Sequence, residues 1–233
     1  MIYVTSDLHG CPPKAFQQLL RRAGFTEDDF LFVLGDVIDL GTYGTELLLW
    51  LTEQPNAQLI LGNHEALLLA CDFLFDEVTE ESLSRLTPEQ LSLVENLIGN
   101  GGGPTLAGLR RLMKKDTELV YGILDYLRDA PLYERIDAGG KTYILVHAGL
   151  DHFRPDRPLS DYQPDELLCV RPSLSTGYFQ DATVIFGHTP TGYYGSQYAG
   201  KALHTPSWIC IDTGAGMGFS PMVLRLDDLA EFY

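Results

Sequence analysis

The feature of this sequence that most restricts its fold is an alternation of apolar runs and helix-like segments in the first 75 residues. Strand-like runs lie at 2–5, 30–36 and 57–65, and segments with helical spacing of apolar residues follow at 13–23, 45–54 and 66–75. Repeated strand–helix–strand units predict a mostly parallel sheet with helices on its faces. In such sheets the ligand site forms at the carboxyl ends of the strands.

Polar side chains stand at that end of all three strand-like runs. They are Asp7 and His9 in the first repeat, Asp36 and Asp39 in the second, and Asn63, His64 and Glu65 in the third. Because the carboxyl ends of parallel strands meet at one edge of a sheet, we expect these side chains to lie together. Glu65 opens the next helix, where a carboxylate suits the helix dipole, so we interpret it as structural.

The rest of the chain changes character twice. Residues 79–98 and 105–129 have helical patterns separated by a glycine run, and we interpret 76–130 as a helical insertion beside the site. Strand-like runs then lie at 132–137, 142–146, 182–186, 207–212 and 222–226. Without a repeat, low-complexity tract or linker, residues 1–233 are expected to form one α/β domain, a sandwich of two sheets flanked by helices.

The charge balance limits the possible partners. Lys and Arg number 16 against 32 Asp and Glu, a net charge of −16, which argues against nucleic acid and anionic membranes as partners. Phosphorylated substrates stay open, because bound metal ions can reverse the local sign of an acidic pocket. The four cysteines form no C-x-x-C pair and predict reduced, mostly buried thiols. With no signal-peptide pattern and no long apolar stretch, we expect a cytoplasmic protein.

Five short segments carry the residue types of a metal site, and each follows an apolar run. They are SDLHG (6–10), GDVIDLG (35–41), GNHE (62–65), VHAG (146–149) and FGHTP (186–190), and they hold four of the six histidines. Carboxylate, amide and imidazole ligands suit Mn, Fe and Zn, and the absence of thiolates argues against a structural zinc site. The candidate ligands are too many for one ion, so the set predicts two metal ions that share a carboxylate.

In this order, the five segments resemble the metallophosphoesterase superfamily, and specifically the small bacterial and phage serine/threonine phosphatase-like branch of the phosphoprotein phosphatase family. The resemblance runs from residue 2 to about 226. It includes NGGG-x-T at 100–105 and ICIDTGAG at 209–216. It implies a calcineurin-like four-layer sandwich, with two mixed β-sheets flanked by helices.

The resemblance also implies a ligand set. Asp7, His9 and Asp36 would hold the first ion, and Asp36, Asn63, His147 and His188 the second, with Mn²⁺ favoured and Fe or Zn as alternatives. A hydroxide that bridges the ions would attack phosphorus in line. His64 would be the general acid for the leaving oxygen, and Asp39 would orient and charge it.

Substrate phosphate would contact Asn63 and Arg171, by the same resemblance. One expected phosphate ligand is missing, because Leu40 stands in GDVIDLG where the family usually has arginine. Leu61 likewise stands where an arginine often precedes GNHE. We take Arg154, in the loop after HAGL, as a hypothetical replacement. We interpret the tyrosines at 193, 194 and 198 as a half-buried loop rather than a substrate groove.

Four functions compete on these residues. The first is a metal-dependent serine/threonine protein phosphatase. The alternative keeps the chemistry but changes the substrate to a dinucleoside polyphosphate, as in diadenosine tetraphosphatases. A cyclic-nucleotide phosphodiesterase is disfavoured, because Pro190 stands where those enzymes usually have a second histidine. A non-catalytic phosphate-binding protein is supported only by Leu40. The partner is therefore expected to be a phosphorylated protein or a small phosphorylated molecule.

Overall fold

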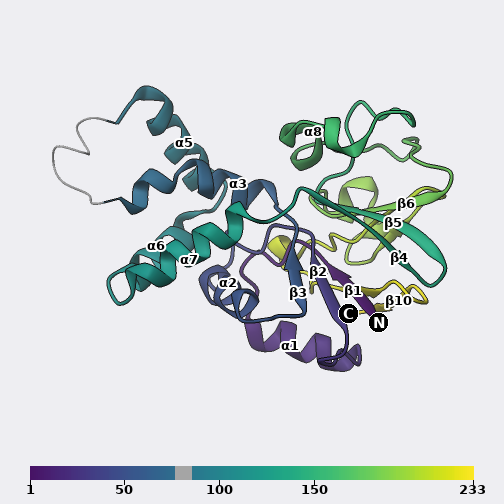
Figure 1. Cartoon of the computed structure of the whole chain (residues 1–233), viewed down its shortest axis with the longest axis horizontal. Helices are drawn as coiled ribbons and strands as arrows, with labels where there is room; N and C mark the ends of the chain where they lie inside the picture. The colour runs from purple at the N-terminus through teal and green to yellow at the C-terminus, as the bar shows by residue number, and fades with distance from the viewer. Residues whose placement is uncertain (77–85) are drawn as a thin grey trace.

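The computed structural model describes residues 1–76 and 86–233, and two five-stranded sheets form its centre (Figure 1). The first sheet has the order β10-β9-β1-β2-β3 and the second has the order β4-β5-β6-β8-β7. Both sheets are mixed, and helices cover their outer faces, as the calcineurin-like sandwich requires.

The first sheet has a parallel half and an antiparallel half. Its strands are β1 (Ile2–Thr5), β2 (Phe30–Val33), β3 (Ala57–Leu59), β9 (Val223–Arg225) and β10 (Ala230–Phe232). Strands β1, β2 and β3 run parallel, with Ile2 opposite Phe30 and Leu31 opposite Ala57. β9 pairs antiparallel with both β1 and β10. The parallel half therefore aligns the carboxyl ends of the three N-terminal strands.

The second sheet repeats this arrangement in the C-terminal half of the chain. Its strands are β4 (Tyr133–Ala138), β5 (Lys141–Val146), β6 (Ala182–Phe186), β7 (Leu203–His204) and β8 (Trp208–Cys210). β5, β6 and β8 are parallel, whereas β4 and β7 are antiparallel edge strands. A second set of parallel strand ends is thus directed toward the same region of the molecule as the first.

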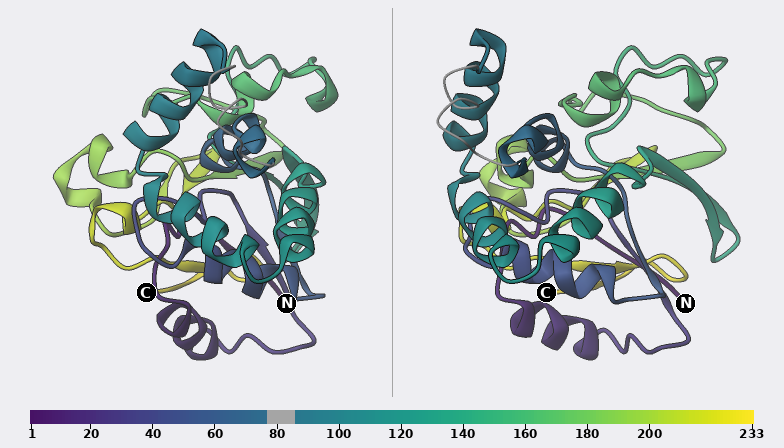
Figure 2. Two further views of the ribbon diagram at one scale, coloured as in Figure 1. Left: turned by 90° about the vertical axis from the view of Figure 1, so that its left-hand side faces the viewer. Right: turned by 60° about the vertical axis from the view of Figure 1, so that its left-hand side comes forward.

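Three buried apolar clusters account for the layering. One lies between the sheets, where residues such as Val4 and Phe32 of the first pack with Leu145 and Ile185 of the second. A second joins the first sheet to α1 (Pro13–Arg22), α2 (Gly44–Thr52), α3 (Asn63–Ala70), α5 (Pro88–Gly99), α6 (Gly103–Met113) and α7 (Thr117–Arg128). The third covers the second sheet beside α8 (Pro164–Leu168). Figure 2 shows the resulting layers from two sides.

The structure corrects several predicted boundaries. The strand predicted over 57–65 ends at Leu59, and the helix predicted from residue 66 begins at Asn63, because the chain leaves the sheet at Gly62. The helix predicted over 105–129 is two helices, α6 and α7, because the Asp116 side chain caps a new helix by accepting the Leu119 N–H. Strands β7 and β10 and helix α8 had not been predicted.

The insertion predicted at 76–130 contains α5, α6 and α7, which pack against α2 and α3 (Figure 1). The helix predicted over 79–98 falls partly outside the described residues. Its described part is α5, which begins where Thr87 and Gln90 form a reciprocal capping box. Within residues 1–76 and 86–233, no helix has the length and apolar character needed to cross a membrane.

The four cysteines carry free thiols, as predicted. The prediction that most of these thiols are buried is correct for two of the four. Cys71 and Cys210 are buried, Cys11 is half-buried and Cys169 is exposed. Cys169 is exposed because it ends the short helix α8 at the surface.

Candidate active site

Loops from both sheets meet beyond the carboxyl ends of the parallel strands. The residues that converge there are Asp7 and His9 after β1, Asp36 and Asp39 after β2, Asn63 and His64 in the first turn of α3, His147 after β5, and His188 after β6. The sequence predicts that these eight side chains meet, and the structure brings them together from segments up to 181 residues apart.

The backbone of this site is mostly left-handed, which is rare for residues other than glycine. Positive φ angles occur at Asp7 (50°), His9 (42°), Asp36 (52°), Asp39 (67°), Leu40 (61°) and His188 (61°), and these are six of the eight such non-glycine residues in the described chain. Asp and His tolerate this region better than most residues. Strained backbone of this kind gathers at functional sites, where the surrounding structure holds it in place.

Hydrogen bonds between the loops hold this backbone. The Asp7 N–H donates to the Gly35 carbonyl at 3.1 Å, and the His9 N–H donates to the Asp36 carbonyl at 2.9 Å. Gly62 lies so close to the Asp36 backbone that a Cβ there would approach the Asp36 nitrogen to 2.4 Å. Only glycine fits at that crossing, which explains the glycine of GNHE.

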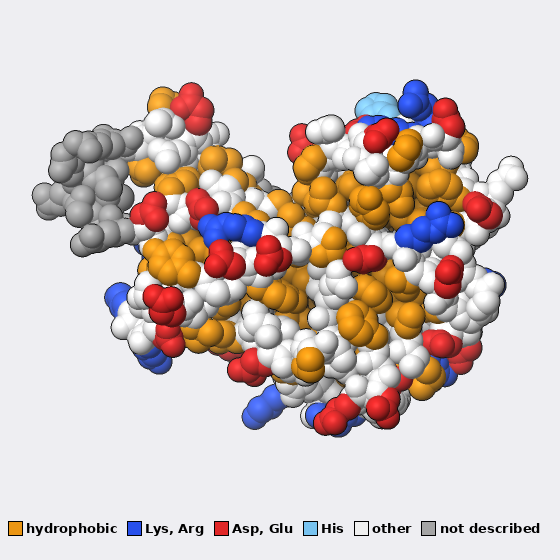
Figure 3. Space-filling view, viewed as in Figure 1, with side chains coloured by type: hydrophobic (Ala, Val, Ile, Leu, Met, Phe, Trp, Pro, Cys, Tyr) orange, Lys and Arg blue, Asp and Glu red, His pale blue; other side chains and the backbone are white. Residues whose placement is uncertain are grey.

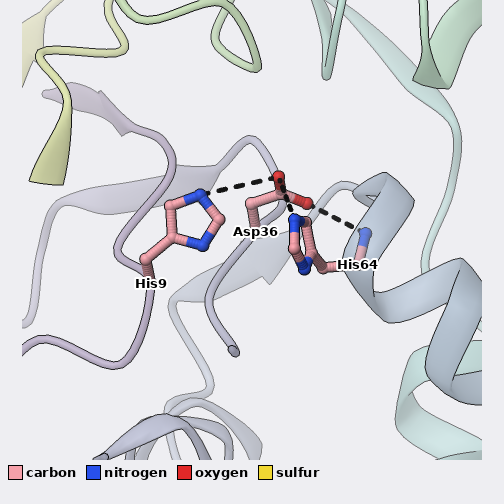
Figure 4. A group of neighbouring side chains, drawn as sticks. All are labelled: His9, Asp36 and His64. Carbon is pink, nitrogen blue, oxygen red and sulfur yellow. Dashed lines mark hydrogen bonds and ion pairs between the residues drawn. The ribbon is translucent and has the colours of Figure 1, made fainter. Parts of the chain in front are cut away.

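Asp36 stands at the centre of the site, with His9 and His64 near one of its carboxylate oxygens (Figure 4) and His147 near the other. Its Oδ2 lies 3.8 Å from Nε2 of His9 and 3.8 Å from Nε2 of His64. Its Oδ1 lies 3.5 Å from Nε2 of His147 and accepts the backbone N–H of His64 at 3.1 Å. Its two carboxylate oxygens therefore face two separate clusters, which is the arrangement that a ligand shared by two ions needs.

Two histidines are fixed in the tautomer that suits metal binding. Nδ1 of His147 lies 2.7 Å from the Leu34 carbonyl, and Nδ1 of His9 lies 3.1 Å from the Ile38 carbonyl. A carbonyl can only accept, so Nδ1 carries the proton and Nε2 presents its lone pair to the site. Burial lowers the pKa of both histidines, that of His9 to about 4, and so keeps them neutral.

Asn63 completes the second cluster. Its Oδ1 lies 2.9 Å from Nε2 of His147 and 2.8 Å from Nδ1 of His188. Because Nε2 of His147 has no proton to donate, its lone pair faces the amide oxygen directly, a contact that a shared cation would stabilise. Burial, reinforced by the charge of Arg171, lowers the pKa of His188 to about 4.

Buried carboxylates make this site favourable for the binding of a cation. The Asp7 carboxylate is buried and accepts the His188 backbone N–H at 3.0 Å from both oxygens. Burial raises the pKa of Asp7 and of Asp36, and for Asp7 the neighbouring carboxylates Asp212 and Asp36 raise it further. A divalent cation offsets both effects. The donor set of this site therefore fits two divalent metal ions, without indicating which metal.

His64 belongs to a hydrogen-bonded chain with Asp39 and Thr105. Nδ1 of His64 lies 2.8 Å from Oδ2 of Asp39, and Oδ1 of Asp39 accepts the Thr105 hydroxyl at 2.6 Å. Burial lowers the pKa of His64, but the Asp39 hydrogen bond and the Asp36 charge outweigh it and raise this pKa to about 9. Ligand atoms of His9, Asp36 and His64, one from each, lie within 4.8 Å of one another, which is close enough to share a metal ion. A protonated imidazole, however, has no free lone pair with which to bind a metal. An imidazole in this protonated form can donate a proton.

The Glu65 side chain stabilises the loop that carries Asp36. Its carboxylate accepts the backbone N–H of Asp36 at 2.8 Å, of Val37 at 2.9 Å and of Ile38 at 3.3 Å. The side chain is fully buried. The structural interpretation made from the sequence agrees with this position, although the carboxylate stabilises the neighbouring loop as well as its own helix.

The sequence model of the calcineurin-like phosphoesterase family matches residues 1–205, which is most of the chain. The chain belongs to this family. Its membership agrees with the two mixed sheets and with the convergence of Asp, Asn and His at the strand ends.

Two relatives and one solved structure are similar to this chain. The symmetrical bis(5'-nucleosyl)-tetraphosphatase of Chromobacterium violaceum is 28% identical over 151 residues, covering 64% of this chain and 43% of the relative. The asymmetrical bis(5'-nucleosyl)-tetraphosphatase PrpE of Geobacillus thermodenitrificans is 25% identical over 255 residues, covering 98% of this chain and 91% of the relative. The crystal structure of a candidate diadenosine tetraphosphatase has a TM-score of 0.61 at 20% identity, covering 99% of this chain and 90% of that one. The matched part of the first relative is thus less than half its length.

A cavity of about 220 Å³ opens over the phosphoesterase site. Asp36, Asn63, His64 and Arg171 line it, together with Leu40 at its edge. Of the two arginines predicted to contact phosphate, Arg171 therefore lines this cavity and Arg154 does not. Arg154 is exposed in the loop after His147 and is not among the residues that line the cavity.

Two residues of the site had no predicted role. Asp212 follows β8 and lines the cavity, and burial raises the pKa of its carboxyl to about 7. Its position just after an apolar run is the signal that also identified Asp7 and Asp36. Thr105 fixes Asp39 from α6, inside the insertion. Of the three tyrosines interpreted as a half-buried loop, Tyr193 is mostly exposed and lines the cavity.

Proposed function

We propose that this phosphoesterase hydrolyses dinucleoside polyphosphates, such as diadenosine tetraphosphate, with two divalent metal ions. From the sequence alone this function is the alternative, behind a serine/threonine protein phosphatase. The relatives reverse that order, because both are named bis(5'-nucleosyl)-tetraphosphatases. The alignment with the Geobacillus relative carries the proposal, since it extends over 98% of this chain.

The proposed metal ligands are those that the resemblance implied. Asp7, His9 and Asp36 would hold one ion, and Asp36, Asn63, His147 and His188 the other. When bound, two such ions lower the pKa of a coordinated water and neutralise phosphoryl oxygens. The chain prepares this chemistry by keeping Nε2 of His9 and of His147 unprotonated and by fixing Asp36 between the two clusters.

The remaining roles belong to protein groups that contact substrate. Arg171 would bind a phosphoryl group through its guanidinium fork, supported by the Asn63 amide. Nε2 of His64 would donate its proton to the oxygen that leaves phosphorus. Asp39 would keep that proton on His64 up to about pH 9, and Thr105 would keep Asp39 in position.

The protonated His64 is also the observation that favours the second candidate, a protein phosphatase. The leaving group from phosphoserine is an alkoxide, which needs a proton more than a leaving phosphate does. A general acid that stays protonated at neutral pH therefore matters most for phosphomonoesters. Its presence keeps phosphoserine substrates in the comparison below.

The deciding experiment loads the protein with Mn²⁺ and assays diadenosine tetraphosphate and a phosphoserine peptide in parallel. We expect turnover of the dinucleotide, with two ADP marking symmetrical cleavage and ATP plus AMP marking asymmetrical cleavage. Asp36→Asn is the control that separates the site from contaminating phosphatases. Phosphate release from the peptide alone would replace the proposal with the protein phosphatase.

A further inference from the structure

A second cavity adjoins the candidate active site and is larger than it. Its volume is about 530 Å³, within the range of small-molecule sites. His9, Leu40 and Gly216 line both cavities, so the two share a wall. Two other cavities, near Trp50 and near Phe179, share no residue with the active site. We refer to the 530 Å³ space as the side cavity.

Exposed apolar side chains gather around these two cavities. Twelve large hydrophobic residues of the described chain are exposed, and six of them line one cavity or both: Leu40, Tyr43, Tyr193, Met217, Phe219 and Tyr233. Three of the six, Tyr43, Phe219 and Tyr233, are aromatic residues of the side cavity, each more than 40% exposed. Aromatic faces left open beside a phosphoryl-transfer site are suited to stacking against a flat ring.

The charge of the side cavity differs from that of the molecule. The chain has twice as many acidic as basic residues, and acidic side chains are scattered over the face seen in Figure 3. None of the described residues that line the side cavity is Asp or Glu, and Arg22 is among them. A polyanion that would be repelled elsewhere on this surface is therefore tolerated here.

Leu40 forms the ridge between the two cavities. Its side chain lies against two glycines, because a Cβ on Gly101 would approach Leu40 Cδ2 to 2.6 Å and one on Gly216 would approach Cδ1 to 2.7 Å. The Leu40 N–H also donates to the Gly101 carbonyl at 3.1 Å. Because Leu40 is uncharged, the ridge is apolar. A positively charged side chain at this position would instead attract a phosphoryl group.

Helix α1 gives the side cavity its length. Ala15, Leu19 and Arg22 line it from successive turns of one helix face. At 1.5 Å per residue, Arg22 lies about 10 Å further along the helix than Ala15. The cavity thus extends about 10 Å along α1, a length that accommodates a ribose and a base.

We infer that the side cavity binds a nucleoside of the substrate, with its base stacked on the aromatic side chains and its phosphate chain passing over Leu40 and Gly216. This inference rests on the proposed function and specifies which part of the chain recognises the nucleotide. It also gives the uncharged residue at position 40 a function.

Two variants test the inference by different routes. Phe219→Ala removes an aromatic face, and Ala15→Trp fills the cavity from an exposed position of α1 without removing any side chain. Gln18→Trp places the same bulk on an exposed position of α1 outside the cavity and serves as the matched control. Melting temperatures of all three verify folding.

The first readout is the ratio of kcat/KM for diadenosine tetraphosphate to kcat/KM for p-nitrophenyl phosphate, which has no nucleoside. We expect this ratio to fall about tenfold in Phe219→Ala and in Ala15→Trp, the change that about 1.4 kcal/mol of lost stacking produces. Gln18→Trp should keep the wild-type ratio. An unchanged ratio in both cavity variants would overturn the inference even if the dinucleotide is cleaved.

The second readout does not need turnover. Calorimetry in the presence of EDTA measures AMP binding, which we expect to weaken about tenfold in Ala15→Trp and not in Gln18→Trp. A wild-type protein that binds AMP in this way but does not cleave the dinucleotide would refute the proposed function and support the nucleoside site. If AMP binds equally to all variants, or not at all, the side cavity is not a nucleoside site.

Discussion

Glu65 offers the sharpest test of how this site is held together. Its buried carboxylate accepts three backbone N–H groups of the loop that carries Asp36. Glu65→Gln keeps the shape of the side chain but turns one acceptor oxygen into a donor. If the glutamine oxygen takes the place of Oε1, the bonds to Val37 and Ile38 survive without charge assistance, and the Asp36 N–H faces an amide N–H.

The cost can be worked out from these contacts. A stranded buried N–H costs about 1–3 kcal/mol, and hydrogen bonds to a charged group exceed neutral ones by roughly 1 kcal/mol each. One stranded donor and two weakened bonds together destabilise the protein by about 3–5 kcal/mol. For a chain of this size that corresponds to a fall in Tm of about 6–20 °C. Metal affinity should also fall, by about tenfold or more, because the Asp36 backbone is no longer fixed.

The assay is thermal denaturation at pH 8 in EDTA, followed by calorimetric titration with Mn²⁺. Glu46→Gln is the matched control, since Glu46 is the first-turn carboxylate of α2 and is exposed. It should lose only its interaction with the helix dipole, about 0.3–1 kcal/mol. If Glu65→Gln costs no more than Glu46→Gln, the carboxylate does not hold the loop and the reasoning fails.

Three further predictions concern the chemistry. Asp36→Asn should abolish turnover and lower the Mn²⁺ retained after desalting, measured by elemental analysis; full metal content with full activity would contradict the dinuclear site. Asp39→Asn should lower the pKa of His64 from about 9, so the loss of kcat at alkaline pH should begin at lower pH, because a general acid must be protonated; an unmoved alkaline limb would exclude His64 as that acid. Arg171→Ala should raise KM for the dinucleotide about tenfold while Arg154→Ala leaves it unchanged, and equal effects would argue against the cavity as the phosphate site.

The sequence predicts the positions of the metal-ligand candidates well because parallel strands align their carboxyl ends. Asp7, Asp36 and His147 each follow an apolar run, and the run itself fixes where the side chain emerges. The same logic would have identified Asp212 after β8. The boundary at Gly62 was predicted less well, because the apolar run before it continues past β3 and Ile60 still donates to the Val33 carbonyl.

Contacts that depend on how the helices pack against one another were beyond sequence reasoning. Thr105 meets Asp39 across 66 residues, and its α6 position depends on how α6 packs against α2. Arg154 illustrates the opposite case, in which closeness in sequence does not bring two residues together in space. It is seven residues from His147 in sequence, but its loop turns back on itself, with the Arg157 N–H bonded to the Arg154 carbonyl, and the side chain stays in solvent.

The left-handed backbone at the site also limits how this enzyme could be redesigned. Exchanging Asp7, His9, Asp36 or His188 for a cysteine or a glutamate, in order to select another metal, would place a residue in a conformation that it rarely adopts. Asparagine is the substitution that the backbone accepts most readily, and it removes the charge. Metal preference is therefore easier to alter through the residues that surround the candidate ligands, such as Glu65 and Thr105, than through the candidate ligands themselves.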